Sequence, residues 1–197
     1  MRRLNNMTYE DVIEYNLRDG GSAVTIFADA QTDRVNKARD IIEELLPECP
    51  ERATIWELGC SAGDIAGYFS EKHDCYGVDI VPAAVAACRE RYPLFNVQQG
   101  AVEDVAPVAC DILVLCEFLE HIINPVKLVL DWLPLARFVV IGHPLVGDGW
   151  DAEPGHLWAY RREDFDNWFP LGGHVMVEAW SFGMYDLDMV IGWGRRT

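Results

Sequence analysis

The sequence has little positive charge and no long apolar run. Lysine and arginine number 16 against 32 acidic residues, which gives a formal net charge of −16. Such a surface repels a phosphate backbone, so we expect no nucleic-acid partner. No apolar stretch approaches the roughly 18 residues that a membrane-spanning helix needs, and the first residues lack a signal-peptide pattern. We therefore expect a cytoplasmic protein without a membrane segment.

The cysteines form no CxxC pair and are not dense enough for a disulfide scaffold, so we expect reduced thiols that are mostly buried. They are Cys49, Cys60, Cys75, Cys88, Cys110 and Cys116. Half of the 197 residues are hydrophobic, which is typical of a globular chain with one sizeable core. No linker or repeat divides the sequence. We expect one domain over residues 1–197, and the sequence does not indicate its oligomeric state.

The first 50 residues predict helices that cover a core formed by residues 51–197. Helical spacing of apolar residues predicts one helix over Thr8–Asp19, ended by Gly20 and Gly21, and another over Asp33–Leu46. Beyond them, short apolar runs alternate with helical stretches, a pattern typical of a parallel sheet with helical crossovers. The expected strands are Thr54–Leu58, Cys75–Asp79, Phe95–Gln98, Asp111–Cys116 and Phe138–Gly142, and the expected helices are Asp64–Glu71, Pro82–Arg91 and Pro125–Leu133.

The end of the chain shows a different pattern. A short helix is expected at residues 161–169, and two alternating runs, His174–Phe182 and Tyr185–Trp193, predict a hairpin around Gly183. The whole pattern predicts a Rossmann-like three-layer α/β/α domain. Its seven-stranded sheet is mostly parallel and ends in a C-terminal antiparallel hairpin.

A turn rich in small residues follows the first expected strand. Glu57 precedes Gly59, Ser61 and Gly63, and small residues there let the backbone approach a ligand closely. A following helix would add free N–H donors, although such glycines also occur for packing alone. A dinucleotide site needs glycine at the positions of Ser61 and Asp64, so NAD fits poorly.

The spacing resembles the first motif of class I S-adenosylmethionine-dependent methyltransferases, an acid followed by three alternate glycines. This chain has Ser61 in place of the middle glycine. The resemblance implies that S-adenosylmethionine binds at Glu57, Gly59, Ser61 and Gly63. It covers roughly residues 50–193 and is most specific at this turn and after the fourth strand.

Two further segments match the family's cofactor site. Asp79 ends the second expected strand about 20 residues downstream, where one carboxylate can accept both ribose hydroxyls, although a strand-terminal aspartate can also cap a helix. The resemblance implies that Asp79 and the adjacent Ile80 hold the ribose side of the cofactor. It also implies that Ala101 and Val102 line the adenine through their backbone, with Ala101 where relatives often have aspartate.

The fourth strand runs from Leu113 into a Leu-Glu-His stretch and strongly resembles small-molecule methyltransferases, including the ubiquinone-biosynthesis O-methyltransferases. The resemblance implies that Cys116 faces the methionine part of the cofactor. Helical spacing would place Glu117, Glu120 and His121 together, as ligands of a divalent ion. A general base at His121 and a residue capping the next helix are the other interpretations, and we assign no metal ligand.

A long segment after the fifth strand contains His156, which we predict as a second candidate for the catalytic base. Trp150, Trp158 and Tyr160 in the same segment are candidates for the wall of an acceptor pocket. The prediction is thus a methyltransferase acting on oxygen or nitrogen of a small molecule. A binding or regulatory protein with the same fold and no turnover is the alternative, favoured by Ser61 and Ala101, and an NAD-dependent oxidoreductase is a weaker one.

Overall fold

The computed structural model describes residues 1–26, 28–144, 155–161, 164, 176–182 and 187–195. Its strands are β1 Arg2–Arg3, β2 Thr54–Leu58, β3 Asp74–Asp79, β4 Asn96–Gln99, β5 Cys110–Cys116, β6 Ala136–Pro144, β7 Trp158–Ala159, β8 Met176–Phe182 and β9 Leu187–Arg195. The α-helices are α1 Tyr9–Ile26, α2 Ala28–Leu45, α3 Pro82–Arg91 and α4 Pro125–Trp132. Short 3₁₀ helices are η1 Leu46–Glu48, η2 Ala66–Phe69, η3 Val102–Asp104, η4 Leu119–His121 and η5 Leu133–Leu135.

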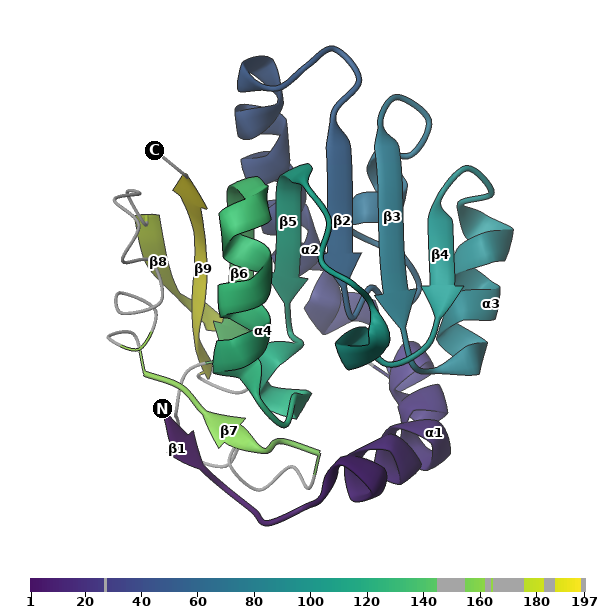
Figure 1. Cartoon of the computed structure of the whole chain (residues 1–197), viewed down its shortest axis with the longest axis vertical. Helices are drawn as coiled ribbons and strands as arrows, with labels where there is room; N and C mark the ends of the chain where they lie inside the picture. Colours follow the sequence, from purple (N-terminus) through teal and green to yellow (C-terminus); the bar gives the residue numbers. More distant parts are fainter. Residues whose placement is uncertain (27, 145–154, 162–163, 165–175, 183–186, 196–197) are drawn as a thin grey trace.

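Seven strands form one sheet in the order β4-β3-β2-β5-β6-β9-β8 (Figure 1). The strands from β4 to β6 are parallel to one another, whereas β9 runs antiparallel to both β6 and β8. The predicted mixed sheet with its C-terminal antiparallel pair is therefore confirmed. The order places β2 between β3 and β5, so the ends of these three strands meet at one edge.

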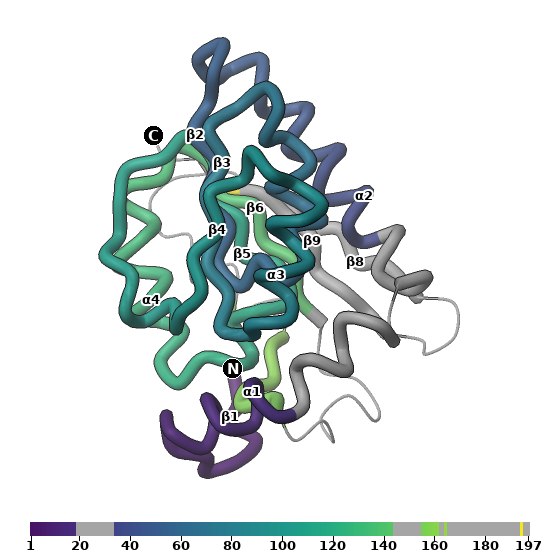
Figure 2. The backbone as a smooth tube through the Cα atoms, turned by 90° about the vertical axis from the view of Figure 1, so that its right-hand side faces the viewer, coloured from purple at the N-terminus to yellow at the C-terminus, as the bar shows by residue number. Residues whose placement is uncertain are grey.

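The sheet is buried on both faces. Along β5, Ile112 and Val114 pack toward α2 and α3, while Leu113 and Leu115 pack toward α4, as expected where successive side chains alternate across a strand. Figure 2 shows α2 and α3 on one side of the sheet and α4 on the other. This is the predicted three-layer arrangement. All six cysteines are free thiols, four of them buried, as expected.

The N-terminal helices differ from the prediction. Thr8 caps α1, because its backbone N–H and hydroxyl both donate to Asp11 Oδ2 at 2.8 Å, and Asp11 N–H donates back to Thr8 Oγ1 at 3.2 Å. The predicted end at Gly20 and Gly21 is wrong, since α1 continues to Ile26. A glycine costs a helix only about 1 kcal/mol and removes no hydrogen-bond donor, so it need not stop one.

The predicted α-helix over Asp64–Glu71 is also wrong, because the segment forms only the 3₁₀ helix η2. The carbonyl of Asp64 would have to accept an N–H four residues on, but it accepts Arg39 Nε at 2.8 Å. Two glycines, Gly63 and Gly67, weaken this segment further. The glycine turn is therefore not followed by the α-helix N-terminus that the sequence led us to expect.

A second, small sheet lies at the edge where the parallel strands end. There β1 pairs antiparallel with β7, Arg2 opposite Ala159 and Arg3 opposite Trp158. Figure 1 shows this pair and α1 lying across that edge. The expected helix at residues 161–169 falls mainly outside the described residues. Among the described helices, none has both the length and the apolar character needed to cross a bilayer.

Candidate active site

The turn after β2 keeps a glycine-like backbone at all three motif positions. Gly59, Ser61 and Gly63 have φ values of +72°, +45° and +80°. A Cβ on Gly59 would lie 2.3 Å from Phe118 Cδ2, so no larger residue fits there. Ser61 adopts the left-handed conformation that glycine favours, and its substitution therefore leaves the shape of the turn intact.

The Glu57 side chain stabilises the segment that follows this turn. Its side chain is buried, and Oε2 accepts the Ala66 N–H at 2.9 Å. Burial raises the pKa of the Glu57 carboxyl to about 8, although the Ala66 N–H opposes the shift. Contact between Glu57 and a cofactor stays a prediction, while the contact with Ala66 is a structural role that the sequence did not reveal.

Asp79 joins the ends of β2 and β3. Its Oδ2 accepts the Ser61 N–H and its Oδ1 accepts the Val81 N–H, both at 2.8 Å. Burial raises the pKa of Asp79, while the Val81 and Ser61 N–H groups oppose the shift. His121 also lowers this pKa, less strongly than the two N–H groups. A carboxylate has further lone pairs, so the two backbone bonds still allow contacts with a ribose.

The predicted adenine segment lies next to Asp79. The Gly100 N–H donates to the Asp79 carbonyl at 3.0 Å, and Ala101 then leads into η3. Ile80 and Ala101 are partly exposed, whereas Val102 is buried. The backbone therefore brings Ile80, Ala101 and Val102 to the same edge as the glycine turn, and their contacts with adenine stay predictions.

The residues after β5 divide into two groups. Cys116 is partly buried at the strand end, and the Glu117 N–H donates to the Gly142 carbonyl at 2.8 Å. Glu117 has φ +50° and its carboxylate forms an ion pair with Arg34 of α2. Burial and, less strongly, Glu120 raise the pKa of Glu117, so these two carboxyls lie near each other as expected, but among the described residues the group of close ligand atoms does not include Glu117. A residue with φ +50° breaks the helical spacing on which the expected grouping depended.

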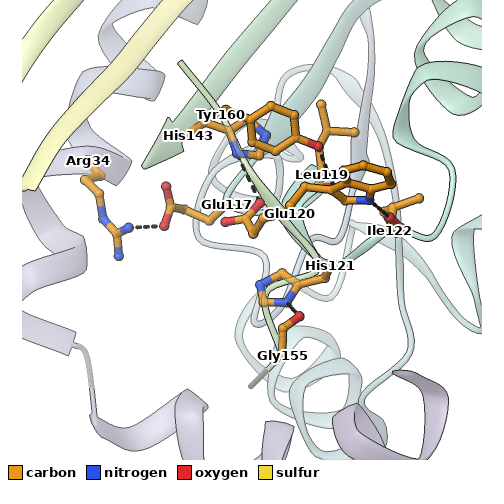
Figure 3. Close-up of polar contacts among 10 residues, drawn as sticks. Arg34, Glu117, Leu119, Glu120, His121, Ile122, His143, Gly155 and Tyr160 are labelled. Atoms are coloured by element: carbon orange, nitrogen blue, oxygen red, sulfur yellow. Dashed lines mark hydrogen bonds and ion pairs between the residues drawn. The ribbon is translucent and has the colours of Figure 1, made fainter. Parts of the chain in front are cut away.

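Glu120 lies among three imidazoles. Its side chain is buried, and Oε2 lies 3.1 Å from Nδ1 of the buried His143 (Figure 3). Burial alone would raise the pKa of Glu120, but His143, and less strongly His121 and His156, lower it to about 2. This close contact between two buried side chains joins η4 to β6.

His121 and His156 face each other across two distant segments. Their ring centroids are 4.9 Å apart with planes at 62°, and His121 Nδ1 lies 2.9 Å from the Gly155 carbonyl (Figure 3). A carbonyl oxygen only accepts, so Nδ1 of His121 carries the hydrogen and, in the neutral ring, Nε2 keeps the free lone pair. Helix α4 is capped by Asn124, whose Oδ1 accepts the Lys127 N–H at 3.1 Å. The capping interpretation of His121 is therefore wrong.

One group of potential metal ligands occurs in the part of the chain that the structure describes. Glu120, His121 and His156 each bring a ligand atom within 4.8 Å of the others. Two imidazoles and one carboxylate suit a divalent transition metal. The set differs from the one that spacing suggested, since His156 takes the place of Glu117.

The aromatic residues of the segment after β6 contribute mainly to packing. Tyr160 is buried and its hydroxyl donates to the Leu119 carbonyl at 3.0 Å, so its expected place in a pocket wall is wrong. Trp158 Nε1 donates to the Ile122 carbonyl at 2.7 Å, and Trp150 lies outside the described residues. Sequence reasoning missed Arg34, which carries no motif, and His143, whose only signal is a polar residue within an apolar strand.

The central parallel strands, the glycine turn after β2 and the carboxylate at the end of β3 together define the class I methyltransferase fold. Comparisons with known proteins agree. A model of the methyltransferase domain family matches residues 56–133. A search of curated proteins finds no sequence relative.

Solved structures share the fold at low sequence identity. Magnesium protoporphyrin IX methyltransferase from Synechocystis PCC 6803, solved with S-adenosylhomocysteine, is similar with a TM-score of 0.75 and 12% identity, over 96% of this chain and 100% of that one. The 1,6-didemethyltoxoflavin-N1-methyltransferase of Burkholderia thailandensis is similar with a TM-score of 0.72 and 15% identity, over 98% of this chain and 92% of that one. The plantazolicin methyltransferase is similar with a TM-score of 0.71 and 11% identity, over 94% of each chain.

The chain thus contains a segment that matches a methyltransferase domain model, and its fold is that of solved S-adenosylmethionine-dependent methyltransferases. The segment that matches the family model begins within β2 and ends in η5, so it contains the glycine turn, Asp79 and the Leu-Glu-His stretch. Arg34, His143 and His156, which contact the site residues described above, lie outside the matched segment.

Proposed function

We propose that the chain transfers the methyl group of S-adenosylmethionine to an oxygen or nitrogen of a small molecule. The acceptor lone pair forms the new bond to the methyl carbon as the carbon–sulfur bond breaks, and sulfur keeps the electron pair. The acceptor then loses one proton to the protein. The positive sulfonium already activates the methyl group, so the protein mainly orients the reactants, excludes water and accepts this proton.

One observation carries this proposal: Asp79 at the end of β3 accepts the Ser61 N–H at 2.8 Å and so joins the glycine turn after β2, while the stretch with His121 follows the neighbouring strand β5. A cofactor carboxylate and a candidate base thus share one edge of the sheet. Open α/β sheets bind their ligands at this edge, outside the carboxyl ends of the strands. The toxoflavin relative was solved with a small-molecule acceptor and S-adenosylhomocysteine together, which supports an acceptor of that class.

We assign the cofactor contacts along this edge. Gly59, Ser61 and Gly63 would contact the methionine part from one side and Cys116 from the other, with Glu57 behind the turn. Asp79 and Ile80 would hold the ribose, and the backbone of Ala101 and Val102 would line the adenine. In this proposal the chain is one domain, in which residues 1–50 cover the core of residues 51–197.

His121 is the proposed general base, through Nε2. The Gly155 carbonyl fixes its tautomer, and a neutral imidazole accepts a proton near neutral pH. His156, 4.9 Å away between ring centroids, is the second candidate for the same role.

A second candidate uses the same residues differently. Glu120, His121 and His156 would hold a divalent cation, which would supply a positive charge that favours the deprotonated acceptor. The close approach of their ligand atoms favours this candidate. It predicts that activity depends on added metal, whereas the base predicts activity that ignores a chelator.

Calorimetry with S-adenosylmethionine, S-adenosylhomocysteine and NAD tests the cofactor. We expect both sulfur compounds to bind and NAD not to bind. Binding of NAD alone would overturn the proposal. Binding of the sulfur compounds without methyl transfer to any fraction of a metabolite extract would identify a binding or regulatory protein instead.

A further inference from the structure

The segment that carries His156 is held from two sides. On one side is η4 with the residue after it. The Leu157 N–H donates to the Glu120 carbonyl at 2.7 Å, and the Trp158 indole donates to the Ile122 carbonyl at 2.7 Å. These bonds attach residues 155–160 to the stretch that contains His121.

On the other side is an N-terminal strap, defined here as residues 2–7. The Leu4 N–H donates to the Leu157 carbonyl at 2.8 Å, and Asn5 Nδ2 donates to the His156 carbonyl at 3.0 Å. The first two residues of the strap form β1, which pairs with β7. Both polar backbone atoms of Leu157 and the carbonyl of His156 are therefore bonded, which holds the backbone that carries the His156 ring.

Asn5 is itself oriented by the strap. Its Oδ1 accepts the Met7 N–H at 3.1 Å, and its carbonyl accepts Arg3 Nε at 2.9 Å. Because an N–H donates to Oδ1, the amide nitrogen must be the atom that faces His156. The donor is thus pre-organised by its neighbours.

Helix α1, which follows the strap, supports the same segment. A Cβ on Gly155 would lie 2.5 Å from Tyr15 Cε1, so the Tyr15 ring packs directly on the backbone of Gly155. The carbonyl of Gly155 in turn fixes His121 Nδ1 at 2.9 Å. The N-terminal segment therefore reaches both histidines, each through one backbone group.

We propose that Asn5 is a positioning residue, which holds His156 beside His121 and couples the N-terminal strap to the acceptor side of the site. The effect on methyl transfer rests on the proposed function, whereas the effect on the positions of the two histidine rings does not. Displacing a reacting group by about 1 Å can cost about 100-fold in rate. A single surface bond from the strap can thus matter for turnover.

The test compares Asn5→Asp and Asn5→Ala with Asn6→Ala, an exposed neighbour of the same type. Asn5→Asp keeps an acceptor for the Met7 N–H but replaces the donor to the His156 carbonyl with a charged oxygen, and Asn5→Ala removes both groups without adding charge. Nitrogen-15 spectra of the histidine rings in the whole chain, with and without S-adenosylhomocysteine, report the pair directly. His73, bonded to the Ala53 N–H at the far end of β2, serves as an internal reference.

We expect both Asn5 variants to shift or broaden the ring signals of His121 and His156, and to leave His73 and the affinity for S-adenosylhomocysteine unchanged. The Asn6 variant should match the wild type. Turnover of an acceptor, once found by methyl-transfer screening, should fall roughly tenfold to 100-fold in the Asn5 variants alone.

Unchanged His121 and His156 signals in the Asn5 variants would overturn the proposal. Loss of the His73 reference signal in both variants would also overturn it, since Asn5 would then serve the fold as a whole. Failure of the wild type to bind S-adenosylhomocysteine would contradict the proposed function instead. The ring spectra recorded without ligand would still decide the role of Asn5.

Discussion

His143 Nδ1 lies 3.1 Å from Glu120 Oε2, and both side chains are buried. This pair connects the carboxyl end of β6 with η4, the short helix that ends at His121. It places a buried charge directly behind the two histidines of the proposed site. The stability of the fold and the geometry of the site therefore depend on the same carboxylate.

Replacing Glu120 should make the free energy of unfolding change less with pH in the acidic range. Because the pKa of Glu120 in the folded protein is about 2 and its ordinary value is 4.5, its contribution is complete above pH 4.5 and is lost as the pH falls toward 2. Glu120→Gln should be less stable at neutral pH by on the order of 3 kcal/mol. Urea unfolding should show this gap narrowing below pH 4.5; a gap that does not change with pH would contradict the ion pair.

Glu57 should give the opposite pH dependence. Its folded pKa is about 8 against an ordinary 4.5, so the folded state retains a proton that the unfolded chain releases. Stability from this group is present below pH 4.5 and is lost as the pH rises through 8. Glu57→Gln, which does not titrate, should gain stability relative to the wild type over this range. If the free energy of unfolding changes with pH in the same way for both proteins, the Glu57 carboxyl has an ordinary pKa in the folded state and this account is contradicted.

Gly59→Ala should disrupt the turn, whereas Gly100→Ala should be tolerated. A Cβ at Gly59 meets Phe118 at 2.3 Å and the residue has φ +72°; at Gly100 the nearest atom is 3.8 Å away. Overpacking and the left-handed backbone together predict a loss of about 2 kcal/mol or more for Gly59→Ala. Thermal unfolding of both variants checks this, and equal melting temperatures would argue against the described turn.

Asp79→Ala should weaken S-adenosylhomocysteine binding by roughly 1.5 to 3 kcal/mol, the value of hydrogen bonds to a charged group. Asp79→Asn retains one acceptor oxygen and should lose less. Asp40→Asn, an exposed acid on α2, is the control. Calorimetry on folded variants measures all three. If Asp79→Ala binds like the wild type, Asp79 serves only to join the Ser61 and Val81 N–H groups.

His121→Ala should leave cofactor affinity nearly unchanged and lower turnover by roughly 100-fold, the usual effect of losing an acid–base group. His156→Ala shows which of the two rings accepts the proton, since the true base gives the larger loss. Both variants should be measured with a chelator and with added divalent metal. Wild-type activity that disappears with the chelator would assign the three-residue group to a cation instead.

The sequence was sufficient for the sheet because its strands follow local patterns. β2 has the predicted bounds, and α3 runs over Pro82–Arg91 as predicted, since proline at the first turn sets its start. The 3₁₀ helix that replaces the expected α-helix after Gly63 was not predictable, because the Asp64 carbonyl accepts a hydrogen bond from Arg39, a residue 25 positions away. Such a long-range contact leaves no periodic signal.

The same contrast holds for the site. Asp79 and the glycine turn follow from spacing along neighbouring strands, so sequence alone placed them together. The pairing of Glu117 with Arg34, and of Glu120 with His143, depends on the tertiary fold. A helical spacing rule grouped Glu117 with His121, but Glu117 has a positive φ and pairs with Arg34 of α2. His156 lies beside His121 in a segment that bonds to the strap and to η4, two parts of the chain far apart in sequence.

Transfer of a labelled methyl group from S-adenosylmethionine into the small-molecule fraction of a metabolite extract tests the central claim most directly. We expect the wild type to label at least one compound, Asp79→Ala to need more cofactor for the same label, and His121→Ala to label far more slowly. Absence of any labelled product from a wild-type protein that binds S-adenosylhomocysteine would contradict the assignment of this chain as an active methyltransferase.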